Sequence, residues 1–203
     1  MIFSVILYNG FETMDVFGPV EVVGTLQKFK KDVLDIEYYS ENGGIVKSSQ
    51  NTRIDTLPIS NIVEENIILI PGGFGARQEI NNQAFINSLK ELSQRAKYVL
   101  TVCTGSALLA KTNLLKNLKA TSNKFSFDWV VEQDNQVNWM RKARWVNDGK
   151  YYTSSGISAG IDMTLGFISD IMGQEVADKI SHRMEYIWNN DKNFDPFSKE
   201  IQL

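Results

Sequence analysis

The chain has 203 residues, a formal net charge of −3 and 43% apolar residues, which is typical of one globular domain with a full core. The acidic balance lacks the basic surface of a nucleic-acid-binding protein, and the single cysteine excludes an intramolecular disulfide framework. We therefore expect one domain over residues 1–203 and no nucleic-acid partner.

The N-terminal stretch "MIFSVILYNG" has no basic segment and no small-residue cleavage site. It is too short to span a bilayer, and so is every other apolar run. We expect no membrane contact and a cytoplasmic location, where a thiol stays reduced.

The first 60 residues contain two apolar strand patterns. Residues 2–8 predict a buried strand, and residues 15–29 have the apolar spacing of a helix. Gly18–Pro19 lies in the first turns of that helix and predicts a late start or a kink. A second strand is predicted over 33–40, and a small hairpin over 43–56.

The middle of the chain repeats the alternation of strand and helix. Residues 66–73, "NIILIPGG", predict a short strand that ends in two glycines. A helix over 82–95, a continuous apolar strand over 97–103 and a helix over 106–115 follow.

The last third begins with a predicted hairpin over 143–155, which turns at Asp148–Gly149. A strongly apolar helix over 158–173 and a second helix over 174–188 follow it. Residues 189–203 have no regular pattern and are expected to be irregular.

Strands that are apolar on both faces and alternate with helices predict a doubly wound α/β domain with a mostly parallel sheet. Ligands of such sheets bind beyond the carboxyl ends of the strands. The loops over 9–15, 71–75 and 103–106 follow three of these predicted ends. We therefore expect the functional residues in these loops.

Cys103 stands where a predicted strand meets a predicted helix, and Thr104, Gly105 and Ser106 follow it. A sharp turn of this kind needs small neighbours, and the helix N-terminus would stabilise a thiolate. The alternative is a buried cysteine that packs as a small apolar side chain. Position alone leaves both interpretations open.

Two other loops offer partners for this thiol. The N–H groups of Gly72 and Gly73 could line an anion site, although glycines at strand ends are also common in plain turns. Asp15 could face the thiol as a proton donor and acceptor, or could simply cap the helix. Glu12, in the same loop, is the rival acid.

Histidine is the usual partner of a catalytic cysteine, but the chain has only His182, in the last predicted helix. Its position also fits an exposed or dimer-facing residue. One cysteine and one histidine do not supply the ligands of a zinc site, so we expect no metal and no cofactor.

Several motifs, in order and spacing, resemble the ThiJ/PfpI superfamily, which shares its fold with class I glutamine amidotransferases. They are "IPGGFG", "VCTGSALLA" and "GISAGIDMTLGFISDIMG". A further set resembles the isonitrile hydratase subgroup and the related sensor domains of transcription regulators: "MDVFGPVEV", "LLKNLKATS", "DGKYYTSSGISAGID" and "MEYIW" followed by "DPF".

This resemblance implies a flavodoxin-like sheet, a nucleophile elbow at Cys103 and a homodimer. It also implies a lyase that hydrates an isonitrile to an N-substituted formamide, with Asp15, Cys103 and Thr104 as the essential residues. The peptidase-like branch has histidine directly after the cysteine, and Thr104 in that place argues against peptidase chemistry.

One departure from the hydratases leaves the pocket lining and the substrate open, and a second departure argues against the regulator role. The hydratases commonly have a histidine and an aromatic residue after "AT", where this chain has Ser122, Asn123 and Lys124. The regulators continue into a DNA-binding module, and this sequence ends at Leu203. A glyoxalase-like or amidase-like activity on the same site, or a redox or electrophile sensor that uses Cys103, remain the alternatives.

Overall fold

A central sheet of eight strands organises the computed structural model, which describes residues 1–30, 34–63 and 67–198. The strand order is β3-β4-β2-β1-β5-β6-β10-β9, and only the edge strands β3 and β9 run antiparallel to their neighbours. The strands are β1 (Ile2–Ile6), β2 (Asp35–Ser40), β3 (Gly44–Lys47), β4 (Arg53–Pro58), β5 (Ile67–Ile70), β6 (Tyr98–Val102), β9 (Trp145–Asp148) and β10 (Tyr151–Ser154). A separate pair joins β7 (Lys119–Ala120) to β8 (Asn138–Trp139).

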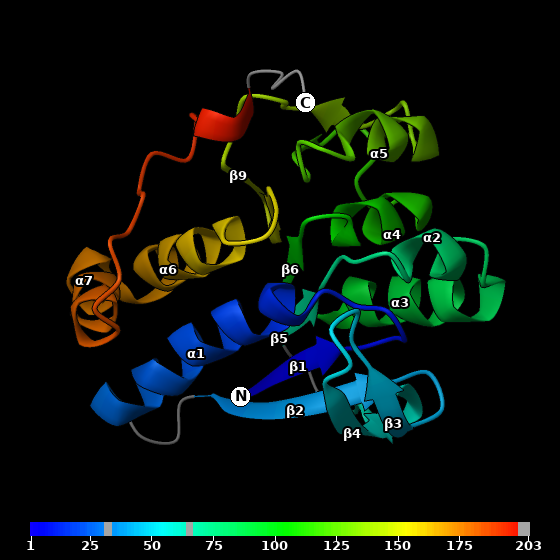
Figure 1. The fold of residues 1–203 in the computed structure, drawn as a ribbon, viewed down its shortest axis with the longest axis horizontal. Coiled ribbons are helices and arrows are strands. Elements are labelled where there is room, and N and C mark those ends of the chain that lie inside the picture. The colour runs from blue at the N-terminus through cyan, green and yellow to red at the C-terminus, as the bar shows by residue number, and fades with distance from the viewer. Residues whose placement is uncertain (31–33, 64–66, 199–203) are drawn as a thin grey trace.

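Helices cover both faces of the sheet (Figure 1). One face carries α1 (Thr13–Phe29), α6 (Ala159–Met172) and α7 (Gln174–Arg183), which contact one another. The other side carries α2 (Ala76–Glu79), α3 (Gln83–Arg95) and α4 (Gly105–Lys111), with α5 (Phe127–Gln133) packed on α4. Two single turns, η1 (Ile59–Asn61) and η2 (Pro196–Ser198), complete the elements. The predicted doubly wound α/β fold is confirmed.

Burial on both faces explains the apolar strands at the centre of the sheet. All four residues of β5 are buried, and so are four of the five in β6. Both predicted hairpins form as antiparallel pairs at the sheet edges, β3 with β4 and β9 with β10. Gly149 takes a positive φ of 61° at the second turn.

Three predicted helix boundaries were wrong. The first helix begins at Thr13, and Pro19 lies inside it, so there is no late start. The helix predicted over 106–115 ends at Lys111, because the chain turns at Asn113 with a φ of 65°. The helix predicted to reach residue 188 ends at Arg183, because Glu185 takes a φ of 52°.

Sequence patterns missed the short elements α2, α5, β7 and β8 altogether. The strand predicted to run into Pro71–Gly72–Gly73 ends at Ile70, and these next residues form the turn that leads to the site. Part of the expected irregular tail forms η2. The first residues of the strands predicted over 33–40 and 66–73, and residues 199–203 of the tail, lie outside the described residues.

The strand order positions the site. From β1 the chain first moves outward to β2, and later returns to β5 on the other side of β1, so a topological switch point lies between β1 and β5. The loops after β1, β5 and β6 meet at the carboxyl ends of these strands. Within the described residues, no helix is both long enough and apolar enough to cross a membrane.

Candidate active site

Cys103 follows the last residue of β6 and takes a φ of 57°, a left-handed backbone conformation that is uncommon for a residue other than glycine. Such a conformation costs on the order of 1–3 kcal/mol and persists only where the surroundings hold it. The side chain is 7% exposed, and its thiol is free. Strain at a strand-to-helix turn is typical of a nucleophile elbow.

Four hydrogen bonds hold the Cys103 backbone in place. Its N–H donates to the carbonyls of Ser154 and Ser155, both at 3.2 Å. Its carbonyl accepts from the hydroxyls of Ser122 at 2.8 Å and Ser106 at 3.1 Å. The strained turn is therefore fixed by neighbouring segments on both sides of it.

Thr104 precedes α4 and acts on both the thiol and the neighbouring loop. Hydrogen bonding from its N–H and its hydroxyl to the sulfur lowers the pKa of the Cys103 thiol. The hydroxyl oxygen also accepts from Gly73 N at 3.0 Å and lies 3.3 Å from the Gly73 carbonyl. Thr104 thus connects the cysteine to the loop after β5.

Asp15 lies in the first turn of α1 and is fully buried. Its Oδ2 accepts from the N–H of Gly72 at 2.9 Å. Its Oδ1 has no hydrogen-bond partner of ordinary length among the described residues, and interaction with the Cys103 thiol lowers the pKa of the carboxyl. Glu12, rather than Asp15, occupies the helix cap. Asp15 and Cys103 therefore come together at the switch point.

Burial dominates the electrostatics of this pair. It raises the pKa of the Asp15 carboxyl well above 3.8, and Glu12 raises it further, while the hydrogen bond from Gly72 opposes the shift. Burial also raises the pKa of the Cys103 thiol well above 9.0, with the charge on Asp15 adding to it. Because two neighbouring buried negative charges are unfavourable, these shifts oppose ionisation of both groups at the same time.

The loop after β5 brings two glycine N–H groups to the site. Gly73 has a φ of 124°, and a Cβ there would lie 2.4 Å from the Gly10 carbonyl oxygen, so only glycine fits. The N–H of Gly72 is bonded to Asp15 and that of Gly73 to Thr104. Their expected role in an anion site stays a prediction, and it requires these bonds to be exchanged for bonds to a substrate.

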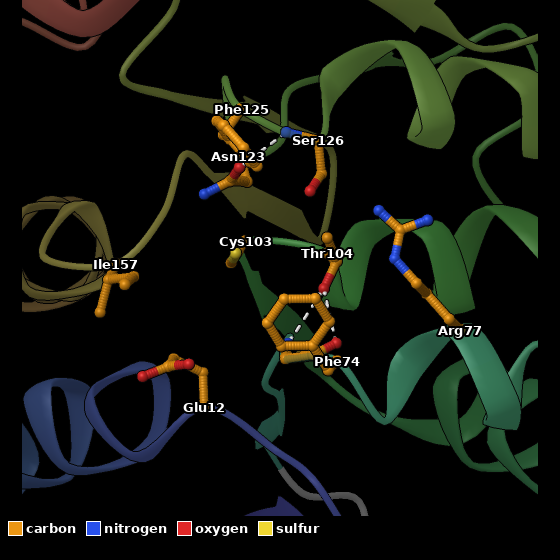
Figure 2. A pocket seen from close by; sticks show the side chains of 10 residues that line it. Glu12, Phe74, Arg77, Cys103, Thr104, Asn123, Phe125, Ser126 and Ile157 are labelled. Carbon is orange, nitrogen blue, oxygen red and sulfur yellow. Dashed lines mark hydrogen bonds between the residues drawn. The ribbon is translucent and has the colours of Figure 1, made fainter. Parts of the chain in front are cut away.

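A cavity of about 280 Å³ opens beside Cys103 (Figure 2). The rim is strongly apolar, since Phe74 is 77% exposed and Phe125 is 88% exposed. His182 lies on α7 and lines a different hollow, so the structure does not bring it to the thiol. The residues that line the Cys103 cavity are Glu12, Gly73, Phe74, Arg77, Cys103, Thr104, Asn123, Phe125, Ser126 and Ile157.

Sequence reasoning missed several residues of this site. A Cβ at Gly156 would lie 2.8 Å from the Cys103 sulfur and 2.3 Å from Asn123 Nδ2, so the thiol has room only because residue 156 is glycine. The available signal was position, because Gly156 follows β10, which runs parallel to β6 and ends at the same edge. Arg77 and Ser126 had no comparable signal.

No group of three or more His, Cys, Asp or Glu side chains within the described ranges is arranged to hold a metal ion. The polar groups nearest the thiol are an acid, a threonine and backbone amides. Such a set suits nucleophilic attack coupled to proton transfer.

Comparison with known proteins places these residues in context. The model of the DJ-1/PfpI family matches residues 3–170. The chain is 24% identical to the isonitrile hydratase of Pseudomonas putida, over 89% of this chain and 76% of that protein. It is also 24% identical to the HTH-type transcriptional regulator CdhR of Pseudomonas aeruginosa, over 89% of this chain but 54% of the regulator. A solved ThiJ/PfpI family protein from Pseudomonas syringae superposes with a TM-score of 0.82 at 25% identity, over 97% of this chain and 77% of that one.

Proposed function

Because the chain belongs to the DJ-1/PfpI family, we propose that it is a cysteine-dependent hydratase of small electrophiles that converts an isonitrile to an N-substituted formamide. Cys103 is the nucleophile, Asp15 moves the protons, and Thr104 stabilises the thiolate. The likeness to isonitrile hydratase supports this choice within a family that also contains regulators.

One observation carries the proposal: the fully buried Asp15 carboxyl, with its raised pKa, lies beside the Cys103 thiol at the strained turn. Most catalytic cysteines use histidine as the base, and the only histidine of this chain lines a different hollow. An acid with a raised pKa serves chemistry that needs a proton delivered to carbon. The terminal carbon of an isonitrile needs such a proton when a nucleophile attacks it.

In the first step the Cys103 sulfur forms a bond to the terminal isonitrile carbon. Asp15 gives its proton to the same carbon, and a thioimidate, R–N=CH–S–Cys103, results. In the reactive form Asp15 is protonated and Cys103 is the thiolate, whose charge is consumed as the charge on the Asp15 carboxylate appears. The single negative charge of the pair therefore moves from one partner to the other.

In the second step the Asp15 carboxylate takes a proton from water, whose oxygen bonds to the thioimidate carbon. Asp15 passes that proton to the substrate nitrogen and then accepts the proton of the new hydroxyl group. The carbon–sulfur bond breaks as the carbonyl forms. The products are R–NH–CHO, the thiolate and protonated Asp15, so the pair returns to its starting state.

The test is formamide production from a simple alkyl isonitrile, measured by chromatography with the purified wild type and with Cys103→Ala. We expect turnover by the wild type and none above background by the variant. No formamide from the folded wild type would contradict the hydratase proposal and leave the fold unaffected.

The same preparation separates the alternatives. Turnover of a 2-oxoaldehyde or an amide in place of an isonitrile would indicate a glyoxalase-like or amidase-like enzyme on the same thiol. Selective, reversible oxidation of Cys103 by mild peroxide, seen by mass spectrometry without turnover of any substrate, would indicate a sensor. The homodimer and the cytoplasmic location stay predictions, and sedimentation velocity would test the dimer.

A further inference from the structure

Arg77 belongs to the wall of the Cys103 cavity, although no step of the proposed reaction uses it. It lies in α2, directly beyond the glycine loop that contacts Asp15 and Thr104. Figure 2 shows its guanidinium on the same side of Cys103 as Ser126 and Thr104, with Glu12 on the other side. The cavity therefore has one positively charged side and one negatively charged side.

The guanidinium is held in place but not neutralised. Its central carbon stacks 4.2 Å from the centroid of the Trp129 ring. No carboxylate lies within ion-pair distance of Arg77 in the part of the chain that the structure describes. A stacked guanidinium keeps the N–H groups along its edge available, and these suit the two oxygens of a carboxylate.

The other lining residues limit what accompanies the charge. Phe74, Phe125 and Ile157 present exposed apolar surface around the mouth of the cavity. The volume of about 280 Å³ lies just below the roughly 300–1,000 Å³ of pockets that enclose drug-sized ligands. A small molecule with a short apolar body fits this space.

We propose that Arg77 binds the carboxylate of the substrate, so that the natural substrate is a small electrophile bearing a carboxylate, with its reactive carbon at Cys103 and its anionic end away from Glu12. This inference rests on the proposed function only in placing the reactive carbon at Cys103. It adds the chemical class of the substrate and assigns Trp129 to positioning the guanidinium.

The experiment compares iodoacetate with iodoacetamide, which differ in one negative charge. In both reactions the Cys103 sulfur bonds to the methylene carbon, iodide leaves with the electron pair, and the thiol proton goes to solvent. Cys103 is the only cysteine, so the mass increase reports this site alone. The ratio of the two rates at one pH cancels changes in the thiolate fraction.

We expect Arg77→Gln to lower the iodoacetate-to-iodoacetamide rate ratio about three- to fivefold, the upper range for an exposed ion pair. Trp129→Leu should lower it in the same direction by less. Arg53→Gln removes an exposed arginine from β4, outside the cavity, and should leave the ratio unchanged. Saturation-transfer NMR compares the binding of butyrate, which carries a carboxylate, with that of the neutral butyramide, and so tests the same preference without a reaction.

An unchanged ratio in Arg77→Gln, together with equal binding of butyrate and butyramide by the wild type, would overturn the inference. An equal fall of the rate ratio in Arg53→Gln would also overturn it, because the ratio would then depend only on the net charge of the protein. Loss of the contrast in Arg77→Gln without isonitrile turnover by the wild type would support the inference and contradict the hydratase. Isonitrile turnover by a wild type that does not distinguish the charged from the neutral reagents would support the hydratase and contradict the inference about Arg77.

Discussion

Asp15 and Asp162 are both fully buried, but their surroundings are opposite. Asp162 Oδ2 accepts from Arg144 Nε at 2.9 Å and Nη2 at 2.8 Å, and its Oδ1 accepts from the Tyr186 hydroxyl and the Asn189 N–H. Asp15 accepts from the Gly72 N–H, and the nearby charge, that of Glu12, has the same sign. Burial raises the pKa of both carboxyls, but the contacts of Asp162 with Arg144 oppose that effect with an opposite charge.

The difference teaches what each acid does. Hydrogen bonds from the Tyr186 hydroxyl and the Asn189 N–H to Asp162 hold the segment after α7 against α6. Arg144 pairs with Asp162 and also faces the buried Asp195 at 3.5 Å, nearer the end of the chain. Among the described residues Asp15 has no ion-pair partner, and its carboxyl lies beside a thiol. A buried acid with a full set of partners stabilises structure, whereas one without an opposite charge is poised to exchange a proton.

The largest expected effect comes from Asp15→Asn. The amide keeps the shape and the acceptor for Gly72 but cannot deliver a proton, so kcat/KM for an isonitrile should fall about 10²- to 10⁴-fold. The free energy of unfolding at neutral pH should stay the same or rise, because a buried ionisable group without a charged partner is removed. Steady-state kinetics and guanidinium chloride denaturation measure the two quantities.

Asp170→Asn makes the same change at an exposed aspartate and is the activity control for this variant. Asp170 accepts from Asn147 and Tyr152 and lies outside the Cys103 cavity, so kcat/KM should stay near the wild-type value. If Asp15→Asn instead kept its activity and lost several kcal/mol of stability, Asp15 would be a structural acid like Asp162.

The second prediction concerns stability. Arg144→Met leaves the carboxylates of Asp162 and Asp195 buried without this partner, and breaking a buried pair from one side costs about 3–5 kcal/mol. Chemical denaturation would measure the loss. Arg141→Met removes the exposed ion pair with Asp128 and should cost less than about 1 kcal/mol. Equal losses of unfolding free energy in both variants would mean that the buried ion pair stabilises the fold no more than the exposed one.

The two regions also differ in how far the sequence predicted them. The thiol and the glycine loop were predictable because each directly follows an apolar strand, and the acid because it begins the helix after β1; parallel strands bring their carboxyl ends to one edge. The Arg144–Asp162 pair was not, because its members come from a β-hairpin and a helix whose contact depends on tertiary packing. The predicted helix over 174–188 ended early for the same reason, since Tyr186 and Asn189 turn back to Asp162.

The residues that line the cavity were the other part that the sequence could not predict. Gly156 matters because a Cβ there would collide with the Cys103 sulfur, and Arg77 because no carboxylate among the described residues pairs with it. Neither property can be predicted from residue type or spacing, because both depend on tertiary contacts. Helix periodicity also failed for α2 and α5, because elements of four and seven residues are too short to repeat an apolar pattern.

Lys124 connects the two regions and gives the smallest expected effect. Its Nζ donates to the Ser122 carbonyl and lies 3.9 Å from Asp195, while Ser122 holds the Cys103 backbone. The pKa of Lys124 falls from 10.5 to about 8, because burial lowers it most, Arg141 and Arg144 also lower it, and Asp195 opposes them. Between pH 8 and 10.5 the unfolded chain therefore holds this proton more tightly than the folded one, and the contribution of Lys124 to stability rises with pH.

The unfolding free energy of the wild type minus that of Lys124→Met should therefore increase from pH 7.5 to pH 9.5, as measured in matched denaturant titrations. Lys179→Met, which removes an exposed lysine paired with Glu175, controls for the change in net charge. A difference that shrinks over this range would mean that the attraction of Asp195 outweighs burial. Lys124 would then belong with the fully paired groups around Asp162 rather than with the poised groups around Asp15.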